Sequence, residues 1–201
     1  MLKIGPQYKI ARRLGPIFEK TQTQKFATRL QQREQRAGRR RGRQPSAYAL
    51  ELLEKQKLRF SYGLKEKHLA NYVEKALNAH DATDKTLFAL LERRLDSIVY
   101  RAGFAATRRQ ARQLVSHGHF LHNGRRVTVP SIQVQVGDTI EVRQGSKSSP
   151  LFSDLAGRLN DHKNPAWITS KLQELQIEVV DNPSTTIYEF DYKKIIEYYT
   201  R

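Results

Sequence analysis

The stretch from Leu91 to Val142, LERRLDSIVYRAGFAATRRQARQLVSHGHFLHNGRRVTVPSIQVQVGDTIEV, decides the fold. Its hydrophobic residues recur first at the three-and-four spacing of helices and then at the two-residue spacing of strands. The first spacing predicts an amphipathic helix over 85–102. A second helix is expected to begin after Thr107, since Gln110 stands three residues later, as in a capping box.

The period of two predicts a small sheet after these helices. Phe120 and Val127 lie on either side of Asn123-Gly124, which favours a hairpin with a type I′ turn because that turn needs two residues with positive φ. The alternation continues over 132–142 and predicts a second strand pair. The expected fold class is therefore α+β, with a helix-helix-sheet module placed inside a helical protein.

The flanks of the module differ in composition. Residues 1–45 show neither period and little hydrophobic material, so we expect a basic arm, part of it disordered until it binds a partner. Residues 46–90 are expected to form a small helical subdomain that begins at the capping residue Ser46. The module then takes 91–144, and 145–201 are expected to pack back on the helical subdomain.

Charge indicates the class of partner. The 201 residues carry 36 Lys and Arg against 20 Asp and Glu, a net charge of +16. Residues 1–60 hold sixteen basic and four acidic side chains, whereas 151–201 hold six and eight. A gradient of this kind favours a polyanion partner for the first three quarters of the chain. No hydrophobic stretch is long enough for a membrane span, so we expect no membrane partner and a cytoplasmic location.

The second helix of the module predicts an RNA-binding face. At 100° per residue, Arg109, Arg112 and Gln113 fall opposite the hydrophobic side, with Arg108 at the border. Guanidinium groups bind phosphate oxygens bidentately, and the histidines and asparagine of the following turn suit phosphate, 2′-hydroxyl or an unstacked base. The candidate RNA-binding residues are Arg12, Arg13, Arg39, Arg40, Arg41, Arg43, Lys57, Arg59, Arg93, Arg101, Arg108, Arg109, Arg112, Gln113, His117, His119, Asn123, Arg125 and Arg126.

Two arginines of the first helix allow two interpretations. Arg94 and Arg101 fall within its hydrophobic stripe, so each either pairs with a buried carboxylate or borders the RNA-binding face. Asp96 is near in sequence but lies on another part of the helical wheel, and the choice stays open. The run 39-RRRGR-43 is expected to contact the RNA backbone.

Catalysis and metal binding are not expected. The cluster 117-HGHFLH-122 straddles a turn into a strand, no carboxylate lies close to it in the sequence, and the chain has no cysteine. A glycine-rich phosphate loop and a nucleophile elbow are also missing from the sequence. We therefore expect no enzyme activity, no catalytic residue and no cofactor.

The 91–142 stretch resembles the RNA-binding module named after small-subunit ribosomal protein four. The flanking stretches resemble that ribosomal protein family as well, and the similarity covers most of the chain from about Pro45. The start 3-KIGPQYKIARRLG-15 looks like the cysteine-free bacterial and organellar form, so the zinc knuckle of other members is not carried over. The flanking stretches are 51-ELLEKQKLRFSYGLKEK-67, 143-RQGSK-147, Pro165-Ala166-Trp167 and 195-IIEYYTR-201.

The resemblance implies a structural constituent of the small ribosomal subunit. Members bind ribosomal RNA (rRNA) early, at a helix junction of the 5′ domain, and nucleate assembly of the subunit body. They lie near the site where messenger RNA enters, contact ribosomal proteins three and five, and affect translational accuracy. The ribosome concerned is bacterial or organellar. Alternatives are a free regulatory RNA-binding protein, or an RNA-modifying enzyme that carries the same module, for which the flanks leave no room.

Overall fold

The computed structural model describes residues 4–38, 45–153, 155–160, 162–171, 174–184 and 189–201. The chain divides into two compact units. Unit 1 comprises Met1–Asp84 with Ile187–Arg201, and unit 2 comprises Lys85–Thr186.

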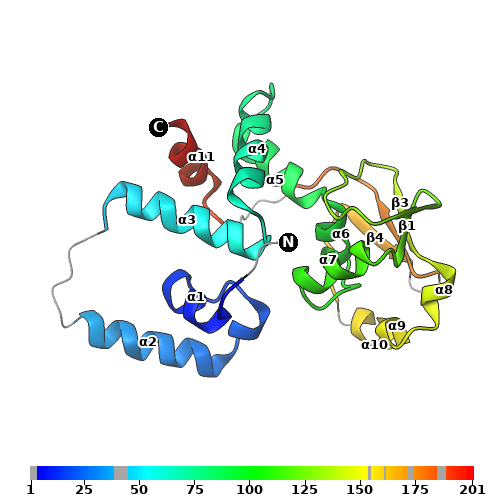
Figure 1. The fold of residues 1–201 in the computed structure, drawn as a ribbon, viewed down its shortest axis with the longest axis horizontal. Helices are drawn as coiled ribbons and strands as arrows, with labels where there is room; N and C mark the ends of the chain where they lie inside the picture. The colour runs from blue at the N-terminus through cyan, green and yellow to red at the C-terminus, as the bar shows by residue number, and fades with distance from the viewer. Residues whose placement is uncertain (1–3, 39–44, 154, 161, 172–173, 185–188) are drawn as a thin grey trace. The chain divides into compact units, whose positions relative to one another are not determined.

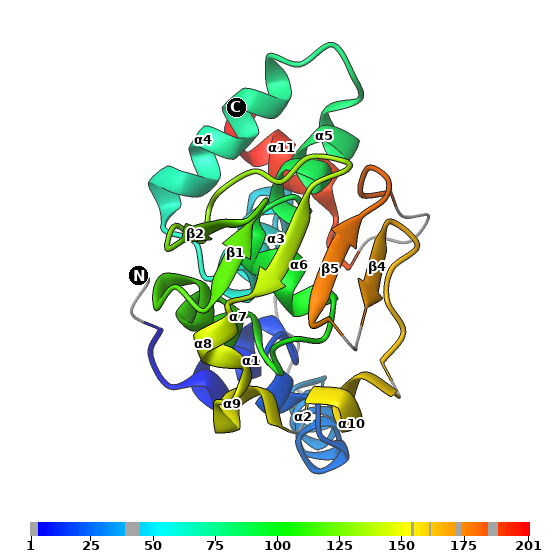
Figure 2. The ribbon, with the colours of Figure 1, turned by 90° about the vertical axis from the view of Figure 1, so that its right-hand side faces the viewer.

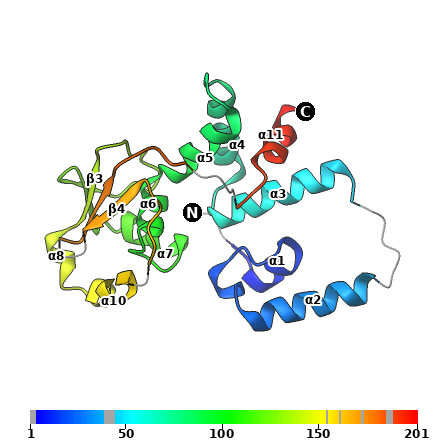
Figure 3. The same cartoon turned by 180° about the vertical axis from the view of Figure 1, so that it is seen from behind.

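Unit 1 is helical in the residues that the structure describes. Figures 1 and 3 show α1 lying between α2 and α3. The helix α5 (Thr83–Glu92) leads from unit 1 into unit 2. The other helices of unit 1 are α1 (Gln7–Leu14), the 3-10 turn η1 (Glu19–Thr21), α2 (Gln24–Gly38), α3 (Ala47–Ser61), α4 (Glu66–Leu77) and α11 (Tyr192–Thr200).

Residues 7–38 of the expected basic arm are mostly helical, although the sequence showed no helical period there. A small buried cluster holds this segment together. It consists of Ala11 of α1, Phe18 just before η1, and Phe26 of α2. The sequence did not reveal it because three widely spaced hydrophobic residues give no clear period. The run 39–43 lies outside the described residues.

Helices α3 and α11 bring distant parts of the chain together (Figure 1). Ser46 caps α3 as predicted, with its hydroxyl accepting from Ala49 N–H at 3.3 Å. Glu66 of α4 accepts from Lys55 Nζ at 2.8 Å and from Tyr199 Oη at 2.7 Å. The C-terminal helix is thereby joined to α3 and α4.

Unit 2 contains the sheet. Its described strands run in the order β2-β1-β3-β5-β4, with antiparallel neighbours, as Figure 2 shows. The strands are β1 (Phe120–His122), β2 (Arg125–Val127), β3 (Thr139–Val142), β4 (Ile168–Lys171) and β5 (Gln176–Val179). The helices are α6 (Leu95–Arg101), α7 (Arg108–Ser116), α8 (Gln144–Lys147), α9 (Pro150–Ser153) and α10 (Leu155–Asn160).

The hairpin forms as predicted. His122 pairs with Arg125 at its end, and Asn123 and Gly124 have φ of 49° and 76°. Two successive positive φ angles are the signature of the type I′ turn, which matches the twist of the two strands.

The second predicted strand pair is wrong. Residues 132–136 form no strand and contribute only an isolated bridge at Gln133. The strand β3 pairs instead with β1 and with β5, which comes from the segment 145–201. That segment is divided between the units: β4 and β5 extend the sheet of unit 2, and α11 packs on α3.

The single helix predicted over 85–102 is also wrong. The chain leaves the helix at Arg94, whose φ of −65° and ψ of 138° are extended. The reason is a distant segment: Leu95 N–H donates to Ile132 O at 2.9 Å, and Val134 N–H donates to Arg93 O at 2.9 Å. These hydrogen bonds replace those that would continue the helix, so α5 and α6 are separate.

Candidate nucleic-acid interface

Helix α7 carries four of the nineteen predicted RNA-binding residues, and its start is capped as expected. Thr107 Oγ1 accepts from Gln110 N–H at 3.0 Å. The side-chain oxygen of Gln110 reaches back to accept from Ala106 N–H at 2.9 Å. The buried residues Ala111, Leu114 and Val115 then fix which side of α7 faces solvent.

Glu92 binds two of the predicted RNA-binding arginines inside unit 2. Its side chain is 0% exposed and accepts from Arg101 Nε at 2.8 Å and Nη2 at 3.0 Å. Arg108 Nη2 lies 3.3 Å from the same carboxylate, and its guanidinium stacks 4.7 Å from the centre of the Tyr100 ring. A buried carboxylate with paired arginines orients the start of α7 against α5 and α6.

Asp96 likewise binds two arginines, Arg94 and Arg112. Its side chain, 4% exposed, accepts from Arg94 Nε at 2.9 Å and Nη2 at 2.8 Å. Arg112 of α7 donates to it from Nε at 2.8 Å and Nη2 at 2.7 Å. The pairings of Arg94 with Asp96 and of Arg101 with Glu92 decide the open choice in favour of buried carboxylates. The helical wheel could not show the first pairing, because Arg94 precedes α6 in extended backbone.

The expected solvent face of α7 is therefore smaller than the sequence suggests. Arg108 and Arg112 are paired with carboxylates, whereas Arg109, Gln113 and His117 are exposed. The Arg126 guanidinium of β2 lies against Gly118, where a Cβ would come within 2.5 Å of Arg126 Nε. We call Arg109, Gln113, His117 and Arg126 the module surface.

The strand β2 separates its two arginines. Arg126 is opposite Leu121, and Arg125 is opposite His122. Because successive side chains of a strand point to opposite faces, Arg125 does not join Arg126 on the module surface.

Asn123 and His122 hold the hairpin tip to the loop before β3. Asn123 Nδ2 donates to Asp138 Oδ1 at 2.8 Å, and its own oxygen accepts from Thr139 N–H at 2.9 Å. Asp138 also bonds His122 Nε2 at 2.9 Å. Burial raises the pKa of Asp138, but the bonds from Asn123, Gln135 N–H and His122 together outweigh it and lower that pKa. Asn123 thus has a structural role in the turn.

His119 is half-buried and directed inward. Its Nδ1 lies 3.0 Å from Ser146 Oγ of α8, a residue that is itself buried. Burial, with the neighbouring His117, Arg143 and Arg126, lowers the pKa of His119. The protonated form of this histidine is thereby disfavoured in the folded protein.

Three other predicted residues are engaged within their own units. Lys57 Nζ bonds Glu54 at 2.6 Å, and Arg59 Nη1 lies 3.6 Å from Glu66. Arg93 Nε donates to Val134 O at 2.9 Å. Arg12 and Arg13 are exposed on α1, and Arg39, Arg40, Arg41 and Arg43 lie outside the described residues.

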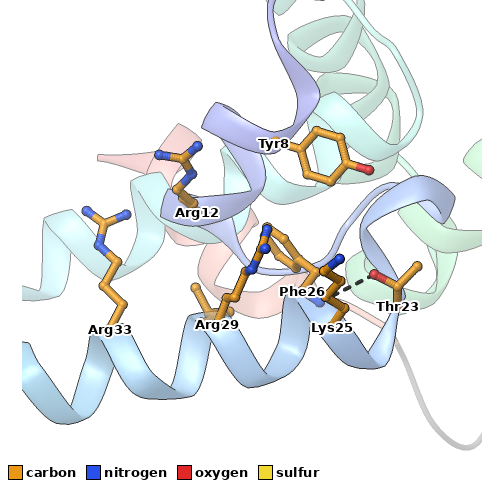
Figure 4. A pocket seen from close by; sticks show the side chains of 8 residues that line it. Tyr8, Arg12, Thr23, Lys25, Phe26, Arg29 and Arg33 are labelled. Atoms are coloured by element: carbon orange, nitrogen blue, oxygen red, sulfur yellow. Dashed lines mark hydrogen bonds between the residues drawn. The ribbon is translucent and has the colours of Figure 1, made fainter.

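The structure reveals a cationic groove that the sequence interpretation missed. It lies in unit 1 between α1 and α2, with a volume of about 730 Å³ (Figure 4). The signal that could have found it is the four-residue spacing of Lys25, Arg29 and Arg33, which places them along one side of a helix. The groove is lined by Tyr8, Arg12, Thr23, Lys25, Phe26, Arg29, Leu30 and Arg33.

The described residues contain neither a metal cluster nor a membrane span. Within the described ranges, no group of three or more His, Cys, Asp or Glu side chains is arranged to hold a metal ion. No helix in that part of the chain is long and hydrophobic enough to cross a membrane.

Two protein families match this chain in succession. Residues 3–92 match the ribosomal protein S4/S9 N-terminal domain, and residues 93–140 match the S4 domain. The chain belongs to the uS4 family of small ribosomal subunit proteins. Membership identifies it as a ribosomal protein rather than an enzyme. The S4 domain match includes α6, α7 and most of β1 to β3, while β4 and β5 extend its sheet.

Curated relatives are similar over 98% of this chain. A small ribosomal subunit protein uS4 of Roseiflexus sp. (strain RS-1) is 44% identical over 201 residues, 98% of each chain. The uS4 of Persephonella marina is 43% identical over 202 residues and that of Aquifex aeolicus 38% over 207, each again with 98% of both chains covered.

Proposed function

We propose that this chain binds small-subunit rRNA as a primary assembly protein of the ribosome, with the module surface as a principal contact. The observation that carries the proposal is the exposure of Arg109 and Arg126 beside Gln113 and His117. In the described part of the chain, neither Arg109 nor Arg126 has an ion-pair partner. Exposed guanidinium groups of this kind bind phosphate and release counterions, which supplies affinity.

The finer role follows from the family. We infer that the RNA bound is a helix junction of the 5′ domain, that binding nucleates assembly of the subunit body, and that the protein lies near the site of messenger entry with an effect on accuracy. Ribosomal proteins three and five are the proposed neighbours, in the cytoplasmic ribosome of a bacterium or, as the alternative, in the ribosome of an organelle. The charge gradient supports this arrangement, since residues 151–201 carry more acidic than basic side chains and suit a basic neighbour.

A salt titration tests the proposal. Binding of the full chain to a 5′-domain rRNA fragment is compared with binding to a scrambled RNA of equal length. A preference of about a thousandfold or more for the fragment, with both affinities falling steeply in salt, is the expected result. Equal affinities would favour the free regulatory RNA-binding protein instead.

The module surface is tested by reversing two of its charges together, Arg109→Glu and Arg126→Glu. Affinity for the fragment should fall, and the slope of log affinity against log salt should decrease by about 0.9 for each phosphate that is no longer neutralised. An unchanged affinity and slope in a folded variant would contradict a role for this surface. Deletion of residues 39–43 should weaken binding to all RNAs about equally, because backbone contacts carry no sequence information.

A further inference from the structure

The groove between α1 and α2 concentrates positive charge. Four of its eight lining residues are cationic, and none of the eight is acidic. Figure 4 shows Arg29 and Arg33 extending from α2 toward α1, the helix that carries Arg12. Like charges gathered in one concavity repel one another, so the groove favours an anionic occupant.

In the part of the chain that the structure describes, these cations have no anionic partner. Among the residues that the structure describes, Arg12, Lys25, Arg29 and Arg33 form no ion pair. This differs from α7, where Arg108 and Arg112 are held by buried carboxylates. The groove charges are therefore available for a ligand, whereas the paired arginines are not fully so.

An aromatic side chain stands at one end of the groove. Tyr8 is 51% exposed, and its ring is backed by the buried Phe26 at a centroid distance of 5.9 Å and an angle of 51°. Tyr8 Oη lies 3.4 Å from the carbonyl oxygen of Lys20, to which it donates. The ring is thus held in place while part of it stays open to solvent, which suits stacking with a planar group.

The cations of α2 are spaced like the charges of an extended polyanion. Residues four apart along a helix rise about 6 Å, so Lys25, Arg29 and Arg33 form a row of about 12 Å. Successive phosphates along an unpaired nucleic-acid strand have a comparable separation. A row of cations beside an exposed aromatic ring is the usual composition of single-strand binding sites.

We propose that this groove binds an unpaired RNA strand, with phosphates on Arg12, Arg29 and Arg33 and a base stacked on Tyr8. The inference rests on the proposed RNA-binding function and names the kind of RNA that unit 1 selects. A duplex would meet the cations but could not stack on Tyr8, because its bases are already paired and stacked.

Fluorescence anisotropy with the full chain tests this site. The probes are a labelled unpaired RNA of about ten nucleotides, within the range of single-strand site sizes, and a blunt-ended RNA duplex, which has no unpaired nucleotides. Arg29→Gln with Arg33→Gln should lower the salt slope for the unpaired RNA by about 1.4, at about 0.7 for each phosphate contact. Tyr8→Leu should weaken that binding by about fivefold or more, and Tyr8→Phe should restore it, since the ring supplies the stacking.

Matched controls separate the groove from the module surface. Arg13→Gln removes an exposed charge of α1 that does not line the groove, and it should change binding to the unpaired RNA much less than the double variant does. Circular dichroism and urea unfolding establish that each variant is folded. Tyr8→Leu should leave duplex binding unchanged.

Three results would overturn the proposal. One is a folded Arg29→Gln, Arg33→Gln variant with unchanged affinity and slope for the unpaired RNA. Another is an equal effect of Tyr8→Leu on the unpaired RNA and the duplex. The third involves an acidic peptide of the same charge as the RNA. If it competes as strongly as the RNA does, and if Tyr8→Leu does not change its affinity, the groove binds a protein partner instead. None of these three results bears on the preference for the rRNA fragment over the scrambled RNA. Loss of that preference alone would refute the proposed function and leave the proposal for the groove standing.

Discussion

The module surface of unit 2 and the groove of unit 1 are both cationic, but their surroundings hold arginines differently. Of the four arginines of α6 and α7 that the sequence assigned to RNA, three bind the buried carboxylates of Glu92 and Asp96, and only Arg109 does not. In the groove, Arg29 and Arg33 have no such partner in the described residues. The difference teaches that a paired arginine shapes a surface, while an unpaired one is ready to bind a ligand.

The largest effect is expected at the centre of the paired network. Glu92→Gln leaves Arg101 and Arg108 without their buried counter-charge, which should lower the free energy of unfolding by about 3–5 kcal/mol. Urea unfolding followed by circular dichroism measures it. Glu178→Gln is the matched control, because Glu178 pairs with Lys171 at the exposed end of the sheet, where such a pair contributes about 0–1 kcal/mol. Equal unfolding free energies of the two variants would contradict a structural role for Glu92.

A contrast of two neighbours on α7 sharpens the comparison. Arg112→Gln should destabilise the protein by about 1.5–3 kcal/mol, because it removes a charged hydrogen-bond donor from buried Asp96. Arg109→Gln should leave stability unchanged and reduce rRNA affinity and its salt slope, since this side chain is exposed. Unfolding and binding are measured on both variants. The reverse pattern would show that Arg112 is the main RNA contact and that its pairing with Asp96 contributes little.

A smaller effect is expected at the hairpin tip. Asn123→Ala removes the hydrogen bonds to Asp138 and to Thr139 N–H and places alanine at positive φ. The free energy of unfolding should fall by about 1–2 kcal/mol. Asn123→Gly keeps the turn conformation and removes only the hydrogen bonds, so its unfolding free energy should lie between those of the parent and Asn123→Ala. If Asn123→Ala weakened rRNA binding and left the unfolding free energy unchanged, Asn123 would be an RNA contact, as the sequence suggested, and not a structural residue of the turn.

The smallest effect concerns pH. The pKa of His119 is lowered in the folded state, chiefly by burial, so the unfolded chain binds more protons between that pKa and the ordinary value near 6.5. Stability from this group is full above about pH 6.5 and is lost as the pH falls below it. The urea midpoint of the parent should therefore drop between about pH 7.5 and 5.5 by more than that of His119→Asn. Parallel pH profiles would contradict this assignment.

Local features were predicted well because nearby residues determine them. The cap at Ser46, the cap at Thr107 with Gln110, and the turn at Asn123-Gly124 each depend on residues within a few positions of one another. Hydrogen-bonding side chains at a fixed spacing are enough to identify such elements.

The features that were missed depend on distant partners. The break at Arg94 is caused by hydrogen bonds from 130–134, and β3 takes β5 as a neighbour from more than thirty residues away. The helices around the groove share a small core whose hydrophobic residues are too widely spaced to give a period. No pattern within one window of sequence contains these pairings.

The sequence by itself determined the family, the basic character of the chain, and the order of helices and hairpin in the module. It also supplied a set of candidate RNA-binding residues. Only the tertiary structure decided which of those residues are available. Glu92 and Asp96 lie within the same stretch as the arginines they bind, yet the pairings depend on how α5, α6 and α7 pack. A charge is committed to the protein or left for RNA by the partner that folding places beside it, and sequence spacing does not specify that partner.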